Sequence, residues 1–186
     1  MGDDSLDDLN PLAEEAAQGR IFVCKDQNTT RTAVLAQTAF VDTTPTFLIN
    51  SPAAGNKYKK IIESFILEQL APAAGGVIVY EAWWDAVARY VSGGTRVDPK
   101  CIYNYSDVVD TVDFDFWVNP TVAARSASAV RIDSGRFTAS VDSMIDIDPD
   151  EDMIIGPGVG SLAIYLYAAT TAPSFHYEFR VIQKDN

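Results

Sequence analysis

The residues that could support catalysis are few, and their spacing argues against an enzyme. The chain contains one histidine, His176, so a Ser-His-Asp or Cys-His site would have to take its general base from that residue. No Gly-x-Ser-x-Gly turn or reactive-cysteine signature accompanies it. We therefore expect His176 to lie on the polar face of a surface strand. We predict no catalytic residues and a protein that is not an enzyme.

Carboxylates beside tryptophans are the other candidates for chemistry. Asp113 and Asp115 alternate with Trp117 close by, and a similar trio is formed by Glu81, Trp83 and Asp85. Glycoside hydrolysis needs two carboxylates at a set separation across an open cleft. The same alternation is typical of the wetted face of a β-sheet. A glycan-active enzyme therefore stays an alternative.

An acidic cluster resembles a calcium loop at first sight. Asp146, Asp148 and Asp150 have the one-three-five spacing of an EF-hand. The sixth position is Glu151 instead of glycine and the twelfth is Pro157 instead of glutamate, so the motif fails. We predict a solvated acidic loop and neither a metal nor a cofactor. A looser calcium site in the loop 146–152 is left open.

The elements that must position these side chains are short β-strands. Runs rich in Val, Ile, Tyr, Phe and Thr recur from Arg20 onward between turn-forming residues. The expected strands are Ile21–Lys25, Thr32–Phe40, Thr46–Ile49, Lys59–Leu70, Val77–Trp84, Val87–Tyr90, Val112–Val118, Ser128–Ile132, Phe137–Val141, Ser161–Ala168 and Phe175–Ile182. The expected turns include Pro72–Gly76, Ser92-Gly-Gly-Thr95 and Asp133-Ser-Gly135.

Alternation of apolar and polar residues indicates antiparallel strands with one wetted face. Phe175, Tyr177, Phe179 and Val181 share one face of the last expected strand, and a period of two also runs through Val112–Val118. Lys59–Leu70 fits a helix as well, but its β-branched and aromatic content favours a strand. The prediction is an all-β, antiparallel β-sandwich of jelly-roll type, with a barrel as the alternative.

The first 19 residues differ from the rest of the chain. Asn10 suits a helix N-cap and Pro11 the first helical position, so we expect a small helix over Leu12–Gln18 that ends at Gly19. So short a helix is unstable alone in water. We divide the chain into an acidic N-terminal arm, residues 1–19, and a β-sandwich domain, residues 20–186. The arm is either a solvated tail or orders against a neighbouring subunit.

The composition of the chain limits the classes of partner that we expect it to bind. The formal net charge of −12 disfavours nucleic acid and anionic membrane as partners. No apolar run is long enough to cross a membrane as a helix, and the acidic start MGDDSLDDLN is unlike a secretory signal. We expect synthesis in a cytoplasm, with Cys24 and Cys101 as reduced, buried thiols.

A set of turn and strand motifs resembles small phage virion proteins. These are Thr46-Phe-Leu-Ile-Asn-Ser51-Pro, Ser92-Gly-Gly-Thr95, Ile155-Gly-Pro-Gly158 leading into Ser161-Leu-Ala-Ile-Tyr-Leu-Tyr, and Ala169-Thr-Thr-Ala-Pro173 before an aromatic last strand. The resemblance covers residues 46–183 and leaves the arm unmatched. It implies a capsid decoration (cement) protein on the virion surface, trimeric, bound to the major capsid protein by an N-terminal arm.

The expected contact residues are apolar. In the arm they are Leu6, Leu9 and Leu12, and in the sandwich they are Trp83, Trp84 and Trp117. The second function considered is a glycan- or receptor-binding module of a phage tail or fibre, in which the same tryptophans would form a sugar platform.

Overall fold

The chain is nearly all β, and its sheets are antiparallel. The computed structural model describes residues 15–16, 18–26, 33–51, 58–71, 76–102, 111–138, 144–147, 154–156, 160–168 and 171–185. One sheet, called here the first sheet, has the strand order β12 (Met144–Ile147), β4 (Tyr58–Ala71), β15 (Ser174–Asp185), β1 (Ile21–Cys24), β8 (Lys100–Cys101), with β13 (Ile154–Ile155) paired to β4 and β2 (Val34–Leu35) to β15.

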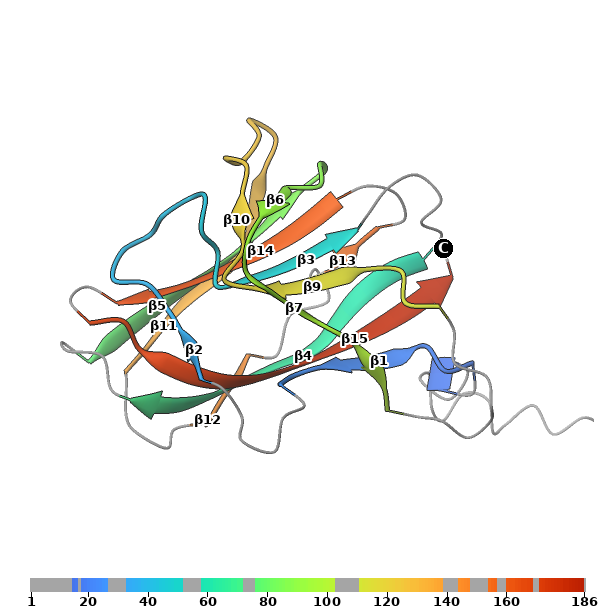
Figure 1. Cartoon of the computed structure of the whole chain (residues 1–186), viewed down its shortest axis with the longest axis horizontal. Helices are drawn as coiled ribbons and strands as arrows, with labels where there is room; N and C mark the ends of the chain where they lie inside the picture. Colours follow the sequence, from blue (N-terminus) through green and yellow to red (C-terminus); the bar gives the residue numbers. More distant parts are fainter. Residues whose placement is uncertain are drawn as a thin grey trace, which may run out of the picture.

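The second sheet faces the first (Figure 1). Its strand order is β11 (Val130–Thr138), β5 (Val77–Asp85), β14 (Gly160–Ala168), β3 (Phe47–Ser51), β9 (Asp115–Val118), β7 (Thr95–Val97). A small ribbon of β6 (Tyr90–Ser92) and β10 (Thr121–Val122) projects beside it. The strands described form separate ladders for the two sheets, whereas a barrel would join them.

Alternation produces the strands that face the core, as predicted. In β15, Phe175, Tyr177, Phe179 and Val181 are buried, while His176 and the other intervening residues point outward. The ambiguous segment 59–70 is a strand, β4, which pairs with β15 over almost its whole length. A sheet face of aromatic and β-branched side chains decides this over helical spacing.

One predicted turn is wrong. Asp133-Ser-Gly135 lies inside β11, so the expected strands Ser128–Ile132 and Phe137–Val141 are replaced by a single one. A β-carbon on residue 135 would lie 2.4 Å from Cε1 of Tyr80, so glycine serves here to admit the tyrosine ring. The turn Ser92-Gly-Gly-Thr95 is confirmed, because Gly93 and Gly94 have φ values of 66° and 73°.

Other strand bounds also need correction. β6 begins at Tyr90, where the prediction placed a strand over Val87–Tyr90. Of the predicted Thr32–Phe40 only Val34–Leu35 is a described strand, and in the predicted Val112–Val118 the strand begins at Asp115. The prediction missed the short strands β7, β8, β10, β12 and β13. Two to four residues carry too little alternation to be recognised.

The two sheets share an aromatic core. Phe47 of the second sheet lies 5.0 Å from Phe179 and 5.8 Å from Phe65 of the first, measured between ring centroids. Phe65 and Phe179 are stacked at 4.1 Å, and Phe116 reaches Phe179 at 4.9 Å. These four rings are fully buried. Apolar area removed from water on both inner faces therefore holds the sheets together.

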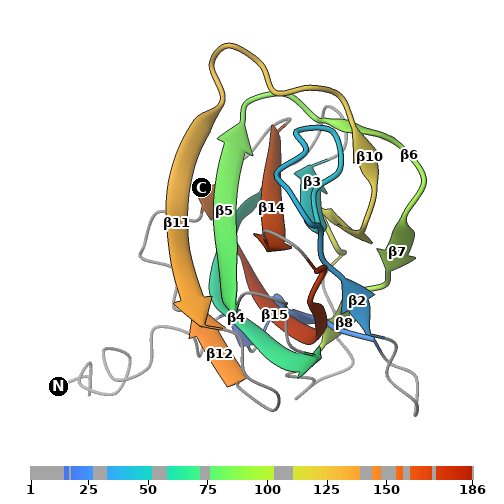
Figure 2. The same ribbon diagram turned by 90° about the vertical axis from the view of Figure 1, so that its left-hand side faces the viewer.

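Strand order in the two sheets corresponds position by position. β12, β4 and β15 are adjacent in the first sheet, and β11, β5 and β14 are adjacent in the second. The chain passes directly between the members of each pair, from β4 to β5, from β11 to β12 and from β14 to β15. Figure 2 shows β11 and β5 side by side along one side of the molecule, with β12 and β4 below them. Three neighbouring strands of the first sheet are thus each consecutive in the chain with one of three neighbouring strands of the second sheet.

Little of the expected N-terminal arm is described. Glu15 and Ala16 are helical and Gly19 has a φ of 66°, but most of the predicted helix Leu12–Gln18 lies outside the described residues, so that helix stays a prediction. Leu6, Leu9 and Leu12 lie outside the described residues. The backbone N–H of Arg20 donates to the carbonyl of Glu15, and the Lys184 ammonium lies 3.6 Å from the buried Glu15 carboxylate. No helix among the described residues is long and apolar enough to span a membrane.

Truncating a central ring should show how far stability depends on this core. We expect Phe179→Ala to lower the free energy of unfolding by about 3–5 kcal/mol, because it removes a fully buried ring and leaves a cavity. Leu35→Ala, at a side chain that is 58% exposed, is the control and should change it by less than about 0.5 kcal/mol. Urea unfolding followed by tryptophan fluorescence measures both, and equal losses would contradict the assignment of the core.

Candidate functional site

The predicted tryptophan contacts do not form one patch. Trp83 and Trp84 are consecutive in β5, so their side chains leave opposite faces of the second sheet. Trp83 lies in a row across the outer face, where register pairs it with Ala163, then Leu48, then Trp117. No local pattern in the sequence reveals this row of side chains, because its members come from four strands that are far apart in the chain.

Side chains of the same chain cover both outer tryptophans. The Arg125 guanidinium lies 3.7 Å from the ring centre of Trp83, whose indole N–H donates to the Glu81 carboxylate at 2.8 Å. Tyr90 stacks on Trp117 with ring centres 4.0 Å apart and planes 18° apart. Each contact covers one face of an indole ring. Trp83 and Trp117 pack against a second, smaller core cluster on the outer face.

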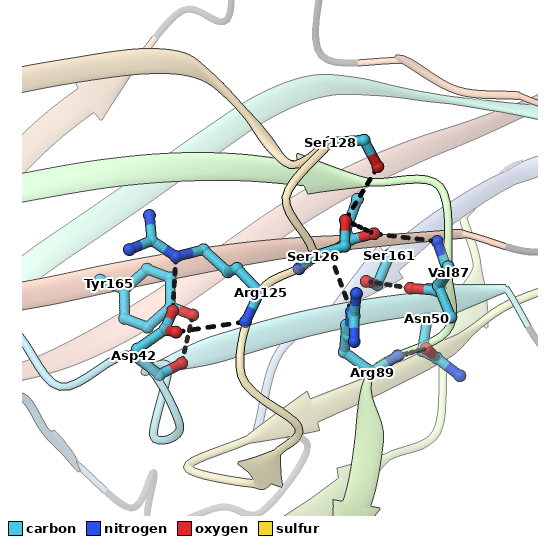
Figure 3. A network of polar contacts seen from close by, with 10 residues as sticks. Asp42, Asn50, Val87, Arg89, Arg125, Ser126, Ser128, Ser161 and Tyr165 are labelled. Carbon is cyan, nitrogen blue, oxygen red and sulfur yellow. Dashed lines mark hydrogen bonds and ion pairs between the residues drawn. The ribbon is translucent and has the colours of Figure 1, made fainter.

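A loop is tied onto this face by Asp42. Its carboxylate accepts hydrogen bonds from the side chain and the backbone N–H of Arg125, and its carbonyl accepts one from the Tyr165 hydroxyl at 2.8 Å (Figure 3). Phe40 packs on Tyr165 with ring centres 4.8 Å apart. The segment preceding β3 is therefore fastened over the sheet by an ion pair and an aromatic contact.

Asp85, predicted as part of a possible catalytic trio, organises two loops. Its carboxylate accepts hydrogen bonds from Nε of Arg89 at 2.8 Å, from the backbone and hydroxyl of Ser126 at 2.9 Å, and from the backbone N–H of Val87 at 3.1 Å. The backbone N–H of Arg89 and the hydroxyl of Ser161 extend the network (Figure 3). Burial alone would raise the pKa of Asp85, but these donors outweigh it and hold the pKa below its usual value. With its carboxylate fully hydrogen-bonded, Asp85 therefore holds the two loops in place.

Glu81, the other carboxylate of that trio, is also engaged. Its two oxygens accept from the Trp83 indole and from the Tyr167 hydroxyl, each at 2.8 Å. Burial and the hydrogen bond to Glu81 raise the pKa of Tyr167 to about 12. Glu81 and Asp85 thus hold separate parts of the fold.

Asp113 and Asp115 are separated by their partners. The Lys60 ammonium, whose side chain is fully buried in the first sheet, lies 3.3 Å from the Asp113 carboxylate. Asp115 instead binds the Arg96 guanidinium of β7 at 2.6 Å on the outer face. Asp113 precedes the start of β9, so the predicted alternation does not extend to it. The expectation that both carboxylates share one face is therefore wrong.

Burial lowers the pKa of Lys60 from its ordinary value, while the charge of Asp113 and their hydrogen bond oppose that shift. The pair connects the two sheets at the end where β4 and β13 meet. Tyr58 donates its backbone N–H to the same Asp113 carboxylate, and Gln183 accepts from the backbone of Asp113 at 2.6 Å. This is a structural ion pair in a polar pocket of the core.

His176 lies on the outward face of β15, as predicted. Register places it beside Glu68 of β4, and the Nδ1 atom is 3.5 Å from the Glu68 carboxylate. Among the described residues no three His, Cys, Asp or Glu side chains gather at a distance suited to a metal ion. Of the acidic loop, residues 148–152 lie outside the described part of the chain, so the calcium hypothesis stays a prediction. Cys24 is a buried free thiol as predicted, whereas Cys101 is only half-buried, so the prediction of a buried side chain there is wrong.

A cleft between the sheets was not predicted. Its volume is about 540 Å³, and its lining includes Lys25, Arg96, Asp98, Lys100 and Asn119 together with the aromatic Tyr177. Lys25 pairs with Glu178 at 2.9 Å, and Lys100 with Asp98 at 2.5 Å. Burial raises the pKa of Tyr177, so the phenol stays protonated and available as a donor. No local motif marks this cleft, because its walls come from β2, β7, β8, β9 and β15 and from the residues that follow β1.

Removing Asp113 or Asp115 should have unequal consequences. We expect Asp113→Asn to lower the free energy of unfolding by about 3 kcal/mol, because it leaves the Lys60 ammonium buried without its counter-charge. Asp115→Asn should cost less than about 1 kcal/mol, since Arg96 is largely exposed.

The sign of the pH dependence follows from Lys60. Losing Asp113 lowers the pKa of Lys60 further, so the folded variant releases its proton at a lower pH than the unfolded chain. The loss in free energy of unfolding caused by Asp113→Asn should therefore become smaller as pH rises above neutrality. The loss caused by Asp115→Asn should not change with pH. Urea unfolding at several pH values measures both, and similar deficits for the two variants would disprove the structural role of the pair.

Comparison with known proteins assigns no family to this geometry. No family model matches the sequence, and no curated protein is a significant match. The functional proposal therefore rests on the chain's own residues and their arrangement.

Proposed function

We propose that the chain is a structural virion protein, a decoration protein that binds the outer surface of a phage head and stabilises it. The observation that carries this proposal is the use of the reactive and aromatic side chains. Asp85, Asp113 and Asp115 each hold a cation of the same chain, and Trp83 and Trp117 each lie under one of its side chains. Side chains that stabilise the fold in this way suit a protein that binds to other proteins as a rigid unit.

The fold supports the same proposal. The matching order of three strands in each sheet is the arrangement expected when an antiparallel ribbon folds over two sheets, as in a jelly roll. Such a sandwich resists deformation because strands distant in sequence are paired along its full width. We propose a jelly-roll sandwich as the architecture, assembled as a homotrimer and located on the capsid surface after synthesis in the host cytoplasm.

Charge and exposed apolar side chains fit a surface partner. A net charge of −12 limits attraction to the packaged nucleic acid and keeps particles apart in solution. Val87, Val91 and Val130 are 48%, 59% and 51% exposed around the end of β5 and the small ribbon. With Trp83 and Trp117 covered by their own chain, these valines are better placed than the tryptophans to touch the major capsid protein.

Assembly tests this proposal directly. We expect the purified protein to be a trimer by light scattering and to co-sediment with empty capsids of its source phage at a saturating stoichiometry. Val91→Asp/Val130→Asp should weaken capsid binding at least tenfold, because it places charges in an apolar contact. Leu35→Asp, equally exposed on the first sheet, is the control. Wild-type protein that ignores capsids would disprove the function.

The cleft favours a second candidate, a glycan-binding module of a tail or fibre. Its lining offers the hydroxyl of Tyr177, the amide of Asn119 and charged groups on both sides, the mixture that orients sugar hydroxyls. For this function we expect a hit on a glycan array whose affinity falls at least tenfold in Asp98→Ala/Lys100→Ala. Lys184→Ala, outside the cleft, should leave it unchanged. Because no tryptophan lines the cleft, calorimetry is the suitable measurement, and a blank array excludes this candidate.

A further inference from the structure

Strand β11 lies at an open edge of the second sheet. It has nine residues, pairs with β5 on one side, and has no neighbour on the other among the described strands. Figure 2 shows it along the outer margin of the molecule. The N–H and C=O groups on this free side can pair with one more strand.

Two arginines mark the outer face of this edge. Arg131 and Arg136 are exposed, and neither has an anionic partner among the described residues. The other arginines of this face are engaged, Arg89 by Asp85, Arg96 by Asp115 and Arg125 by Asp42. In a chain with a net charge of −12, the two unpaired guanidinium groups on one strand are a local site for acidic side chains.

A bulge gives these arginines a defined spacing. They are five residues apart in β11 but pair with Trp83 and Val79, which are four apart in β5, because the register shifts between Arg131 and Asp133. Although Arg131 and Arg136 are an odd number of residues apart, their side chains therefore lie on the same face of the sheet. An extended strand without a bulge, laid along the free side, would match both arginines with side chains four residues apart, about 13 Å at the usual rise.

The arm of the same protein has that spacing. Residues 3–9 read Asp-Asp-Ser-Leu-Asp-Asp-Leu, in which Asp3 and Asp7 are four apart, as are Asp4 and Asp8. With Asp3 and Asp7 against the arginines, Leu6 falls on the opposite face, where Ile132 and Phe137 of β11 pack at the border of the core. Strand addition to a sheet edge is an established way of binding an extended peptide.

Geometry favours the arm of another copy. Glu15, where the described chain begins, is held beside Arg20 and Lys184 at the end of β15. Figure 1 places this point toward one end of the long axis, whereas the start of β5 and the end of β11 lie toward the other end. The β11 strand of a neighbouring copy is therefore the acceptor that we consider for an arm attached at this point.

We propose that residues 3–9 of one copy add as a strand to β11 of the next copy, held by Asp–Arg pairs to Arg131 and Arg136. The contact joins two different surfaces, so copies related by a rotation that closes would form a ring, and a trimer is such a ring. This inference deepens the proposed function by naming the contact between copies. Self-association is measured without capsids, so each proposal can fail by itself.

Mass in solution tests the arm contact. We expect the wild-type chain to form a closed oligomer, and the deletion of residues 2–13, which spares Glu15, to give a folded monomer. Arg131→Glu/Arg136→Glu should weaken association at least tenfold, and raising the salt concentration should weaken that of the wild type, because the ion pairs are exposed. Lys59→Glu/Lys100→Glu makes the same change in net charge elsewhere and should keep the oligomer.

Charge exchange completes the test. Changing Asp3, Asp4, Asp7 and Asp8 to Lys should abolish association in the wild-type background and restore it in Arg131→Glu/Arg136→Glu. A synthetic peptide of residues 2–13 should bind the arm-deleted protein and shift the amide resonances of β11. A monomeric wild type, an oligomer that survives the arm deletion, or a double arginine variant that associates as well as the control would each overturn the proposal.

Discussion

Packing of Phe47 against Phe65 and Phe179 is the contact on which the rest of the structure depends. It joins the inner faces of two sheets whose strands come from all parts of the chain. Once those faces are closed on each other, every alternate residue of β5, β9, β14 and β15 must point outward, and polar or amphipathic side chains have to be accommodated there. The outer face of the second sheet is organised by that requirement.

On the outer face of the second sheet, ion pairs and aromatic contacts accommodate the outward-pointing side chains. Asp85, Asp42 and Asp115 take arginines that would otherwise be unpaired, and two of these pairs fasten loops over the sheet. Trp117 is stacked under Tyr90 and Trp83 under Arg125, so one face of each ring is covered. Arg131 and Arg136, on the edge strand β11, differ from these arginines because neither has an ion-pair partner among the described residues.

The long central strands were predictable and the edges were not. β1, β3, β4, β5, β14 and β15 were expected within a few residues, because each presents a continuous face of apolar side chains to the core. Gly135 misled the prediction, since a glycine between polar residues usually marks a turn, whereas here it makes room for the ring of Tyr80. Short strands such as β7 and β8 owe their conformation to neighbours, so local sequence does not reveal them.

The sequence by itself determined an acidic, antiparallel all-β chain, and it placed His176 on a polar strand face. Both follow from composition and from period-two alternation, which are local properties. Only the tertiary structure decided that Asp113 turns to Lys60 while Asp115 turns to Arg96, and that Trp83 and Trp84 leave opposite faces of the sheet to meet different neighbours. The partners lie in strands distant along the chain, and register between such strands is set by the packing of the two sheets, which no local pattern encodes.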